Sequence, residues 1–256
     1  MIARKRFGQH FLHDPAVLDR IASAVHPRIN DALVEIGPGQ GALTRALLEF
    51  GCRSLDAIEI DRDLVPLLRE EFANEPRFTV HQADALEFDF TALARERGGR
   101  LRIVGNLPYN ISTPLLFHLL KHVTAIDDMH VMLQREVVNR IAAEPGGGDY
   151  GRLTVMLAPW LAAESLFDVG PGAFQPPPRV WSAVVRLTVR REPAFAVAPR
   201  FAAVVASAFS HRRKTLRNAL KGVVTADQIQ ACNVDPNARP ETIAPEAFNR
   251  LAQVLA

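Results

Sequence analysis

Two short stretches of this chain carry residue types that can act on a nucleotide. One is a glycine-rich run, EIGPGQGALT, over residues 35–44, and the other is Asn106-Leu107-Pro108-Tyr109 inside IVGNLPYNIS. A glycine turn lets a ligand approach the backbone closely, and the tetrapeptide offers hydrogen-bond acceptors and an aromatic ring. If both stretches follow neighbouring parallel strands, they face each other across one crevice, where open α/β sheets bind ligands.

The glycine run fits the cofactor half of such a site. Gly37, Gly39 and Gly41 lie between a predicted strand and a predicted helix, and the Gly-Lys-Ser/Thr of a triphosphate-binding loop is missing. Glu59, 22 residues after Gly37, can accept both ribose hydroxyls of an adenosine cofactor, which NAD would also satisfy. Asp84 favours S-adenosylmethionine because a carboxylate there can read an adenine amino group, although a helix N-cap explains Asp84 equally well.

The tetrapeptide fits the chemistry of an exocyclic amine. The amino nitrogen of adenine is a poor nucleophile, and acceptors aimed at its two protons favour the geometry that attack requires. The side-chain oxygen of Asn106 and the backbone carbonyl of Leu107 can be those acceptors, with Pro108 fixing the carbonyl and Tyr109 stacking on the base. We therefore interpret the pair of motifs as a site for methyl transfer to adenine; an ordinary proline turn is the alternative for the tetrapeptide alone.

A repeating pattern of strands and helices must position these residues. Apolar runs end near Glu35, Glu59, Asp84 and Asn106, at steps of 24, 25 and 22 residues, with helical spacing between them. Further strands are expected at 129–133, 165–169 and 182–189, and helices beyond about Arg190. The pattern predicts a Rossmann-like α/β fold, mostly parallel with an antiparallel last strand, over residues 1–190, and a small all-α domain over residues 191–256.

Composition limits the classes of protein that the chain can represent. It has 256 residues, 48% hydrophobic content, two cysteines without a metal-binding spacing and a net charge of +2. The charge is uneven, because residues 186–256 hold 11 Lys and Arg against 5 Asp and Glu. No signal peptide or membrane span is evident, so we expect a cytoplasmic protein, with a monomer as the default state.

Several motifs together carry a resemblance to one family. FGQHFL, EIGPGQGALT, GNLPYNIST, MLQREVVNRI, YGRLTVM, FQPPPRVWSAVVRL and HRRKTLRNAL resemble the bacterial small-subunit ribosomal RNA adenine dimethyltransferases, the KsgA/RsmA family. The resemblance implies S-adenosylmethionine as methyl donor and no metal. It further implies two adjacent adenines in the 3′-terminal hairpin of 16S rRNA as substrate, in a late, assembling 30S particle.

The resemblance also implies roles for individual residues. Cofactor contacts fall on His10, Leu12, Gly37, Gly39, Glu59, Asp84 and Asn106, although many relatives carry Asn in place of His10. Target-base contacts fall on Asn106, Leu107, Pro108, Tyr109 and Phe174. Phe174 precedes three prolines that can hold its ring against the base opposite Tyr109; without the family it would be interpreted as a hydrophobic plug.

A basic cluster in the last domain is expected to bind RNA. Arg213, Lys214, Arg217 and Lys221 fall within about 100° of arc if residues 201–221 form one helix. Arg212 then projects onto the apolar side, so either the helix breaks near Ser210 or Arg212 serves an interface.

Three alternative functions remain at the level of sequence. A large-subunit RNA dimethylase of the macrolide-resistance type shares the two central motifs. DNA adenine methyltransferases use related tetrapeptides, but usually with Pro in the second place and a dedicated target-recognition domain. A ribosome-assembly factor whose binding matters more than its catalysis is the third.

Overall fold

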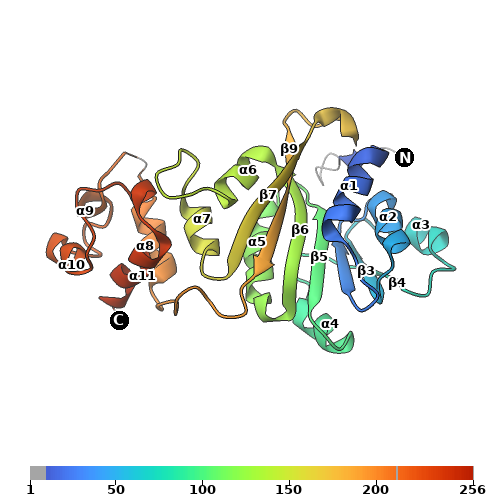
Figure 1. Ribbon diagram of the computed structural model, residues 1–256, viewed down its shortest axis with the longest axis horizontal. Helices are drawn as coiled ribbons and strands as arrows, with labels where there is room; N and C mark the ends of the chain where they lie inside the picture. The colour runs from blue at the N-terminus through green and yellow to red at the C-terminus, as the bar shows by residue number, and fades with distance from the viewer. Residues whose placement is uncertain (1–9, 212, 256) are drawn as a thin grey trace. The chain divides into compact units, whose positions relative to one another are not determined.

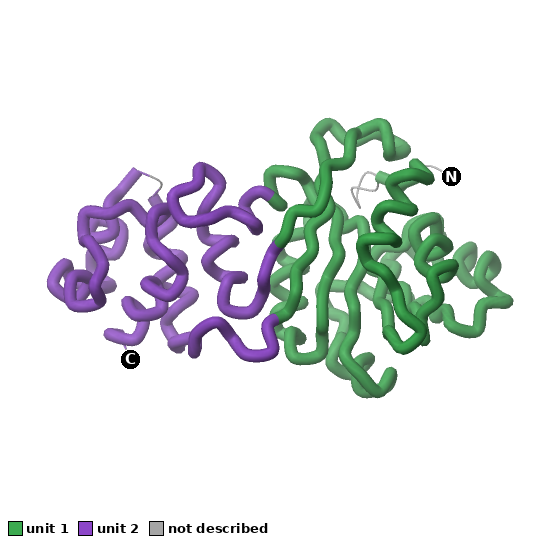
Figure 2. Tube along the Cα trace, in the orientation of Figure 1, with its two compact units in different colours: residues 1–138, 164–189 green, residues 139–163, 190–256 purple. Residues whose placement is uncertain are grey.

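The computed structural model describes residues 10–211 and 213–255, which form two compact units. The first unit runs to Val138 and takes in Glu164–Val189, and the second comprises Asn139–Ala163 and the chain from Arg190 onward (Figure 2). The sequence prediction assigned residues 139–163 to the first domain. In the structure the Tyr150 hydroxyl donates a hydrogen bond to the carbonyl of Ile243, 2.7 Å away, which ties this segment to the C-terminal helices.

A seven-stranded sheet, in the order β4-β3-β2-β5-β6-β9-β7, forms the centre of the first unit. The pairs β4–β3, β3–β2, β2–β5 and β5–β6 are parallel, whereas β9 is antiparallel to β6. The strands are β2 (Ala32–Ile36), β3 (Ser54–Glu59), β4 (Phe78–Gln82), β5 (Leu101–Asn106), β6 (Ile126–Gln134), β7 (Leu161–Val169) and β9 (Ser182–Val189). The predicted fold class is confirmed.

Helices cover both faces of this sheet (Figure 1). They are α1 (Pro15–Val25), α2 (Ala42–Phe50), α3 (Leu64–Glu71), α4 (Phe90–Glu96) and α5 (Ser112–Lys121), with short 3-10 turns η2 (Val123–Ala125) and η3 (Pro171–Ala173). The chain runs outward from β2 to β4 and then returns to β5 and β6. Because such crossovers are right-handed, α2 and α3 lie on one face and α4 and α5 on the other. Helix α1 packs beside α2.

The chain adds β3 and β4 on one side of β2 and then adds β5 and β6 on the other side. This change of side between the parallel strands β2 and β5 sets the position of the crevice. Both strands are largely apolar and buried, as expected for central parallel strands covered on two faces. Their carboxyl ends, at Ile36 and Asn106, lead directly into the glycine run and the tetrapeptide. The two motifs therefore meet at the topological switch point of the sheet, where ligands bind in this architecture.

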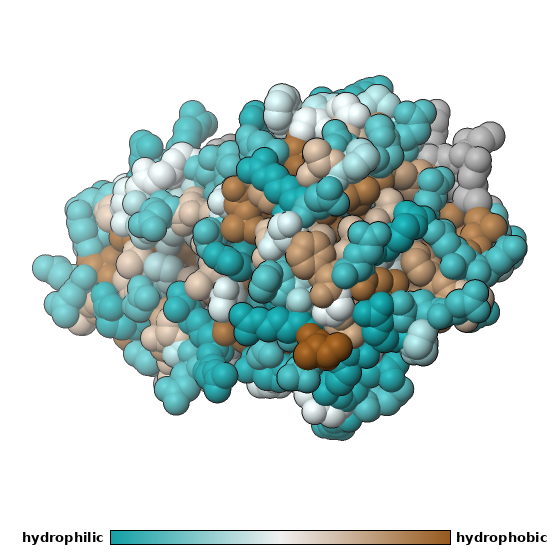
Figure 3. Space-filling view, turned by 45° about the vertical axis from the view of Figure 1, so that its right-hand side comes forward, coloured by the Kyte–Doolittle hydropathy of each residue, from teal (hydrophilic) through white to brown (hydrophobic). Residues whose placement is uncertain are grey.

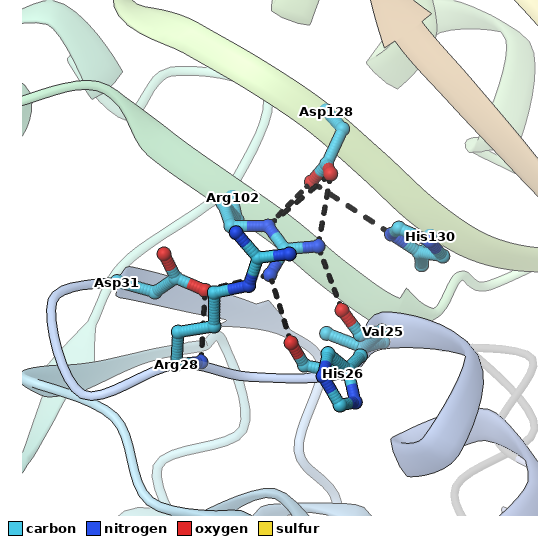
Figure 4. Close-up of polar contacts among 7 residues, drawn as sticks. All are labelled: Val25, His26, Arg28, Asp31, Arg102, Asp128 and His130. Atoms are coloured by element: carbon cyan, nitrogen blue, oxygen red, sulfur yellow. Dashed lines mark hydrogen bonds and ion pairs between the residues drawn. The ribbon is translucent and has the colours of Figure 1, made fainter.

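A single arginine fastens the end of α1 to the sheet. Arg102 donates from Nη2 to the carbonyl of Val25 (2.7 Å) and from Nη1 to that of His26 (3.4 Å) (Figure 4). Its guanidinium also pairs with Asp31 at 2.6 Å and Asp128 at 2.9 Å. The last carbonyls of a helix lack partners within the helix, so this side chain caps α1 as well as joining strand β5 to β6.

The first unit also contains a two-stranded antiparallel ribbon, separate from the main sheet. Strand β1 (Phe11–Leu12) pairs with β8 (Phe174–Gln175), bringing Leu12 opposite Phe174. Both side chains are buried in the core cluster beneath α1 and α2. This pairing joins two segments more than 160 residues apart and holds the residues just before α1 in place.

The second unit is a set of short helices around their own apolar core. They are α7 (Arg152–Leu157), α8 (Phe201–Ala208), α9 (Leu216–Ala219), α10 (Ala226–Ala231) and α11 (Pro245–Gln253), with η4 (Pro240–Thr242); α6 (Arg135–Ile141) leads into the unit. The buried Asn249 side chain accepts from the amide of Ala198 and donates to the carbonyl of Ala196, both at 2.8 Å. The Asn249 side chain thus provides hydrogen-bond partners for two backbone groups of the linker before α8, which lie outside any helix or strand.

The continuous helix predicted over residues 201–221 is wrong. Helix α8 ends at Ala208 and α9 begins only at Leu216, so Arg213 and Lys214 lie in the connection and do not share a helical face with Arg217 and Lys221. The alternative, a break near Ser210, is correct. The Ser210 hydroxyl donates to the carbonyl of Ser207, satisfying one carbonyl of the last turn of α8. Arg212 lies outside the described residues.

Apolar side chains also reach the surface. Figure 3 shows them in patches among polar residues, and the most exposed large ones include Ile29 (71%) and Trp181 (49%). Within residues 10–211 and 213–255, no helix has the length and apolar character needed to cross a membrane.

Candidate active site

A pocket opens at the carboxyl ends of β2, β3, β4 and β5. Its volume is about 930 Å³, including the part open to solvent. Nine of the residues predicted for the site line it: His10, Gly37, Gly39, Glu59, Asp84, Asn106, Leu107, Pro108 and Tyr109. The cofactor motif and the tetrapeptide therefore contribute to one cavity.

The glycine run makes a tight turn under the pocket. Gly37, Gly39 and Gly41 all adopt positive φ angles, +70°, +58° and +76°, which favour glycine over other residues. A Cβ on Gly39 would come within 2.9 Å of the Phe11 ring, so glycine is required there by space as well as by conformation. The turn exposes backbone to the pocket at the point where a ligand would lie.

Two glutamates form hydrogen bonds with this turn and with the helix that follows it. Glu35 is buried in β2 and accepts a 2.5 Å hydrogen bond from the Thr44 hydroxyl; burial raises its pKa to about 7. Glu59 ends β3 and accepts from the amides of Asp61 (2.8 Å) and Gly39 (3.4 Å). Burial also raises the pKa of Glu59. Only Glu59 lines the pocket, with two carboxylate oxygens at the edge where a ribose would be recognised.

Asp84 begins a turn after β4. Its Oδ1 atom accepts from the amide of Leu86 at 2.9 Å, and its carbonyl accepts from the amide of Glu87 at 3.0 Å. The next helix, α4, has Asp89 as its N-cap. The helix N-cap considered for Asp84 is therefore wrong: its side chain caps a turn whose residues line the pocket wall.

Two hydrogen bonds hold the first half of the tetrapeptide in place. The amide of Leu107 donates to the carbonyl of Met132 at 3.1 Å, continuing the pairing of β5 with β6. The Nδ2 of Asn106 donates to the carbonyl of His10 at 2.9 Å. Because that nitrogen is fixed toward His10, the Oδ1 atom of Asn106 is directed away from this carbonyl, as an acceptor.

Tyr109 is positioned by two residues from distant parts of the chain. Its hydroxyl lies 2.6 Å from the Oγ of Ser182, and the His10 ring stacks on it with centroids 5.7 Å apart and planes inclined by 29°. His10 Nδ1 lies 2.8 Å from the carbonyl of Pro176, which can only accept, so Nδ1 carries the proton. Burial raises the pKa of Tyr109.

The structure does not bring every predicted residue to the pocket. Leu12 and Phe174 face each other in the β1–β8 ribbon, at 8% and 2% exposure, and neither lines the cavity. Arg213, Lys214, Arg217 and Lys221 belong to the second unit. Phe174 lies where the alternative interpretation, a hydrophobic plug, expects it, because core side chains enclose its ring.

Sequence reasoning missed other members of the site. Apolar residues next to the recognised ones form much of the wall, and the pocket also includes Phe11, Ile36, Ile58, Ile60, Ala83, Ala85, Leu86, Asn110 and Ile111. Except for Phe11, their positions at or shortly after the carboxyl ends of the central strands were a usable signal. Ser182 gave no such signal, since a serine at the start of a strand is unremarkable until its contact with Tyr109 is seen.

The mostly parallel sheet, its glycine loop and acidic strand end, and the tetrapeptide at the switch point define a Rossmann-like methyltransferase. Residues 2–256 match the family model described as Ribosomal RNA adenine dimethylase, and the chain belongs to that family. It is similar to Ribosomal RNA small subunit methyltransferase A of Pseudomonas aeruginosa, with 58% identity over 99% of this chain and 95% of the relative. The relative of the same name from Hahella chejuensis is 55% identical over 98% of this chain and 92% of its own.

Solved structures agree at the level of the whole chain. The 23S rRNA methyltransferase ErmE is 29% identical with a TM-score of 0.75, covering 96% of this chain and 99% of its own. A dimethyladenosine transferase from Plasmodium falciparum has a TM-score of 0.79 at 24% identity, covering 94% and 96%, which supports the shared fold.

Proposed function

We propose that this protein is an S-adenosylmethionine-dependent enzyme that methylates the exocyclic amino group of adenine in small-subunit ribosomal RNA. Its family membership across nearly the whole chain and relatives at 52–58% identity with a small-subunit name support the substrate. By family resemblance, the products are two dimethylated adjacent adenines in the 3′-terminal hairpin of 16S rRNA, formed late in assembly of the 30S particle.

Asn106 is the observation that carries the proposal. It ends β5 at the switch point, and its backbone carbonyl lies 3.8 Å from the position that a Cβ on Gly37 would occupy. Its side chain is fixed by the carbonyl of His10. One residue thus borders both the glycine loop and the base side of the pocket, so a bound cofactor and an adenine would both contact it. Such proximity supplies much of the rate of a transfer between two bound groups.

The residues of the cofactor half fit S-adenosylmethionine. The two carboxylate oxygens of Glu59 suit the vicinal hydroxyls of a ribose, Asp84 suits an adenine amino group, and Gly37 and Gly39 leave room beside the backbone. Bound there, S-adenosylmethionine would supply an electrophilic methyl group for transfer to N6 of the adenine. His10 closes this half of the pocket through its backbone carbonyl and its stacked ring.

The tetrapeptide prepares the amine for attack. Asn106 Oδ1 and the Leu107 carbonyl accept the two N6 protons and favour a pyramidal nitrogen, and Pro108 keeps the carbonyl turned inward. Tyr109 stacks on the base with the ring face that His10 does not cover, and Ser182 fixes the hydroxyl end of that ring. After attack the proton on the alkylated nitrogen is acidic and leaves to water, so no strong base is required.

Leu12 and Phe174 enter the proposal in different ways. Leu12 supports the cofactor side indirectly, because its pairing with Phe174 anchors the segment that carries His10 and Phe11. For Phe174 we keep the family-derived stacking role as a proposal, but its 2% exposure favours a role in packing. The two roles differ in how a volume-preserving substitution would affect the enzyme.

The basic residues of the second unit are proposed to dock RNA. Arg213 and Lys214 lie in the connection before α9, Arg217 lies in α9 and Lys221 in the turn after it, so they offer separate phosphate contacts, not one helical face. We propose catalysis for the domain predicted over residues 1–190 and RNA binding for residues 191–256. A monomer acting in the cytoplasm without a metal completes the proposal.

The alternatives differ in their support. A large-subunit dimethylase is disfavoured because identity to the 23S rRNA methyltransferase ErmE is 29%, against 52–58% to the small-subunit relatives. A DNA methyltransferase is disfavoured by the family match. An assembly factor remains compatible with that match, since binding and catalysis use different residues.

The proposal is tested by asking which ribosomal subunit accepts the methyl group. Small and large ribosomal subunits are isolated from a strain lacking this methylation and incubated with the protein and S-adenosylmethionine carrying a tritiated methyl group. We expect incorporation into small subunits alone. Incorporation into large subunits alone would assign the protein to the resistance type, and failure with both, while cofactor still binds, would favour the assembly factor.

A further inference from the structure

An exposed tryptophan stands at the rim of the active site without a role in the chemistry above. Trp181 is 49% exposed although large aromatic side chains are usually well buried. It immediately precedes β9, whose first residue, Ser182, is completely buried and holds the hydroxyl of Tyr109. Trp181 is therefore half exposed while the residue directly after it is buried against Tyr109.

The ring is held in place by its surroundings. The carbonyl of Trp181 accepts from the amide of Arg135 at 2.9 Å, and the Arg135 guanidinium carbon lies 5.6 Å from the ring centroid. A Cβ on Gly170 would be 3.7 Å from the far edge of the indole, so the edge lies against this backbone. Arg135 in turn contacts Asp168 at 3.4 Å. These contacts support the ring on one side, while about half of the residue is exposed to solvent.

The location of this pair follows from the topology. Arg135 comes directly after β6, whose Met132 carbonyl binds the tetrapeptide through the amide of Leu107. Strand β9 is antiparallel to β6, so its first residues lie at the same edge of the sheet. Trp181 and Arg135 therefore stand at the same edge of the sheet as Tyr109, with β6 between β9 and β5. Arg179, two residues earlier, is exposed as well and adds positive charge.

We propose that Trp181, supported by Arg135, is a stacking platform for the RNA base next to the adenine being methylated. The inference rests on the proposed function, because an adenine that enters the pocket leaves its neighbour without a stacking partner. An exposed aromatic ring can take up that base whatever its identity, and a guanidinium beside the ring suits the adjoining phosphate. A neutral protein partner would not explain the arginines at this rim.

Substitutions at Trp181 test the platform. Trp181→Ala removes the ring, Trp181→Phe keeps an aromatic surface, and Ile29→Ala serves as a control because Ile29 is an exposed apolar residue before β2, at the other end of the strands. The assay is methyl transfer to small subunits with saturating cofactor. We expect Trp181→Ala to raise the KM for subunits roughly 5- to 100-fold, with kcat little changed, since one base–aromatic stack has about that value. Trp181→Phe stays within a few-fold of wild type, and Ile29→Ala is unchanged.

A direct probe separates stacking from other contacts. Small subunits carry 2-aminopurine beside the target adenine of their 16S rRNA, and its fluorescence is expected to fall on binding wild type or Trp181→Phe but not Trp181→Ala. A KM for Trp181→Ala within twofold of wild type, or equal losses for both variants, would overturn the platform. If wild type transfers no methyl group to either subunit, the proposed function fails instead, and the fluorescence on binding still decides whether Trp181 stacks on RNA.

Discussion

Gly105 is the position where a single added carbon should damage both the fold and the active site. It lies in β5 directly before Asn106, beside Ile36 at the end of β2. A Cβ on Gly105 would be 2.4 Å from the Ile36 carbonyl oxygen and 3.3 Å from the carbon and nitrogen of that residue. All three atoms belong to backbone, so no side-chain rotation can relieve the overlap.

The size of the effect follows from that distance. Ordinary contacts begin near 3.4 Å, so Gly105→Ala must move β5 away from β2 by about 1 Å at the switch point. Overpacking of this kind costs about 1–3 kcal/mol of unfolding free energy. The displaced residues include Asn106 and Gly37, and a misplacement of about 1 Å at reacting groups can lower the rate of transfer by roughly 100-fold.

Two measurements check this prediction. Unfolding in urea gives the free-energy difference, and kcat/KM for methyl transfer gives the effect on the site. Gly148→Ala is the matched control, because a Cβ there has no neighbour within 4 Å and the backbone is not left-handed. Wild-type stability and wild-type kcat/KM in Gly105→Ala would refute the reasoning that these strands meet too closely for a side chain.

Three further substitutions probe separate parts of the account. Glu59→Gln should weaken cofactor binding by about 10- to 100-fold in calorimetry, and wild-type affinity, unlike that of the variant, should fall as pH is lowered through the raised pKa of Glu59. Phe174→Leu should leave the KM for subunits unchanged and destabilise the fold by no more than about 1.5 kcal/mol if Phe174 packs the core, whereas a raised KM would indicate stacking. His130 is buried with no hydrogen bond to either ring nitrogen, and its Nδ1 lies 3.7 Å from a carboxylate oxygen of Asp128 (Figure 4). Burial lowers the pKa of His130 to about 4. The folded state disfavours protonation of His130, whereas the unfolded chain takes up the proton near pH 6.5. The free energy of unfolding is therefore highest above about pH 6.5 and falls as pH drops toward 4, by at most about 3 kcal/mol. His130→Leu should flatten that loss in urea titrations at several pH values, and an unchanged pH profile would contradict it.

The alternation of strands and helices in the first unit was predictable because its signals are local. Each central strand is a short apolar run, and the interval of 22–25 residues between strand ends is set by one crossover helix. Because β2 and β5 are parallel, their carboxyl ends place the glycine run and Asn106 at a common edge. The pocket could therefore be assigned from the sequence once both motifs were recognised.

Contacts between distant segments were not predictable in the same way. The pairing of Leu12 with Phe174 buries a ring that the family resemblance assigns to the target base. The contact of Tyr150 with Ile243 draws residues 139–163 to the helical unit, and nothing in their local composition indicates it. The break after α8 was visible only as an arginine on the apolar side of a helical projection.

The most direct test of the central claim is the product formed by wild type and by Asn106→Ala. Small subunits treated with each protein and S-adenosylmethionine are digested to nucleosides and analysed by mass spectrometry, with cofactor binding measured in parallel. The account predicts dimethyladenosine with wild type and a rate lower by about 100-fold or more with Asn106→Ala, because one of the two acceptors for the amine is removed. Wild-type rates in the variant, or methylation of a different base, would contradict it.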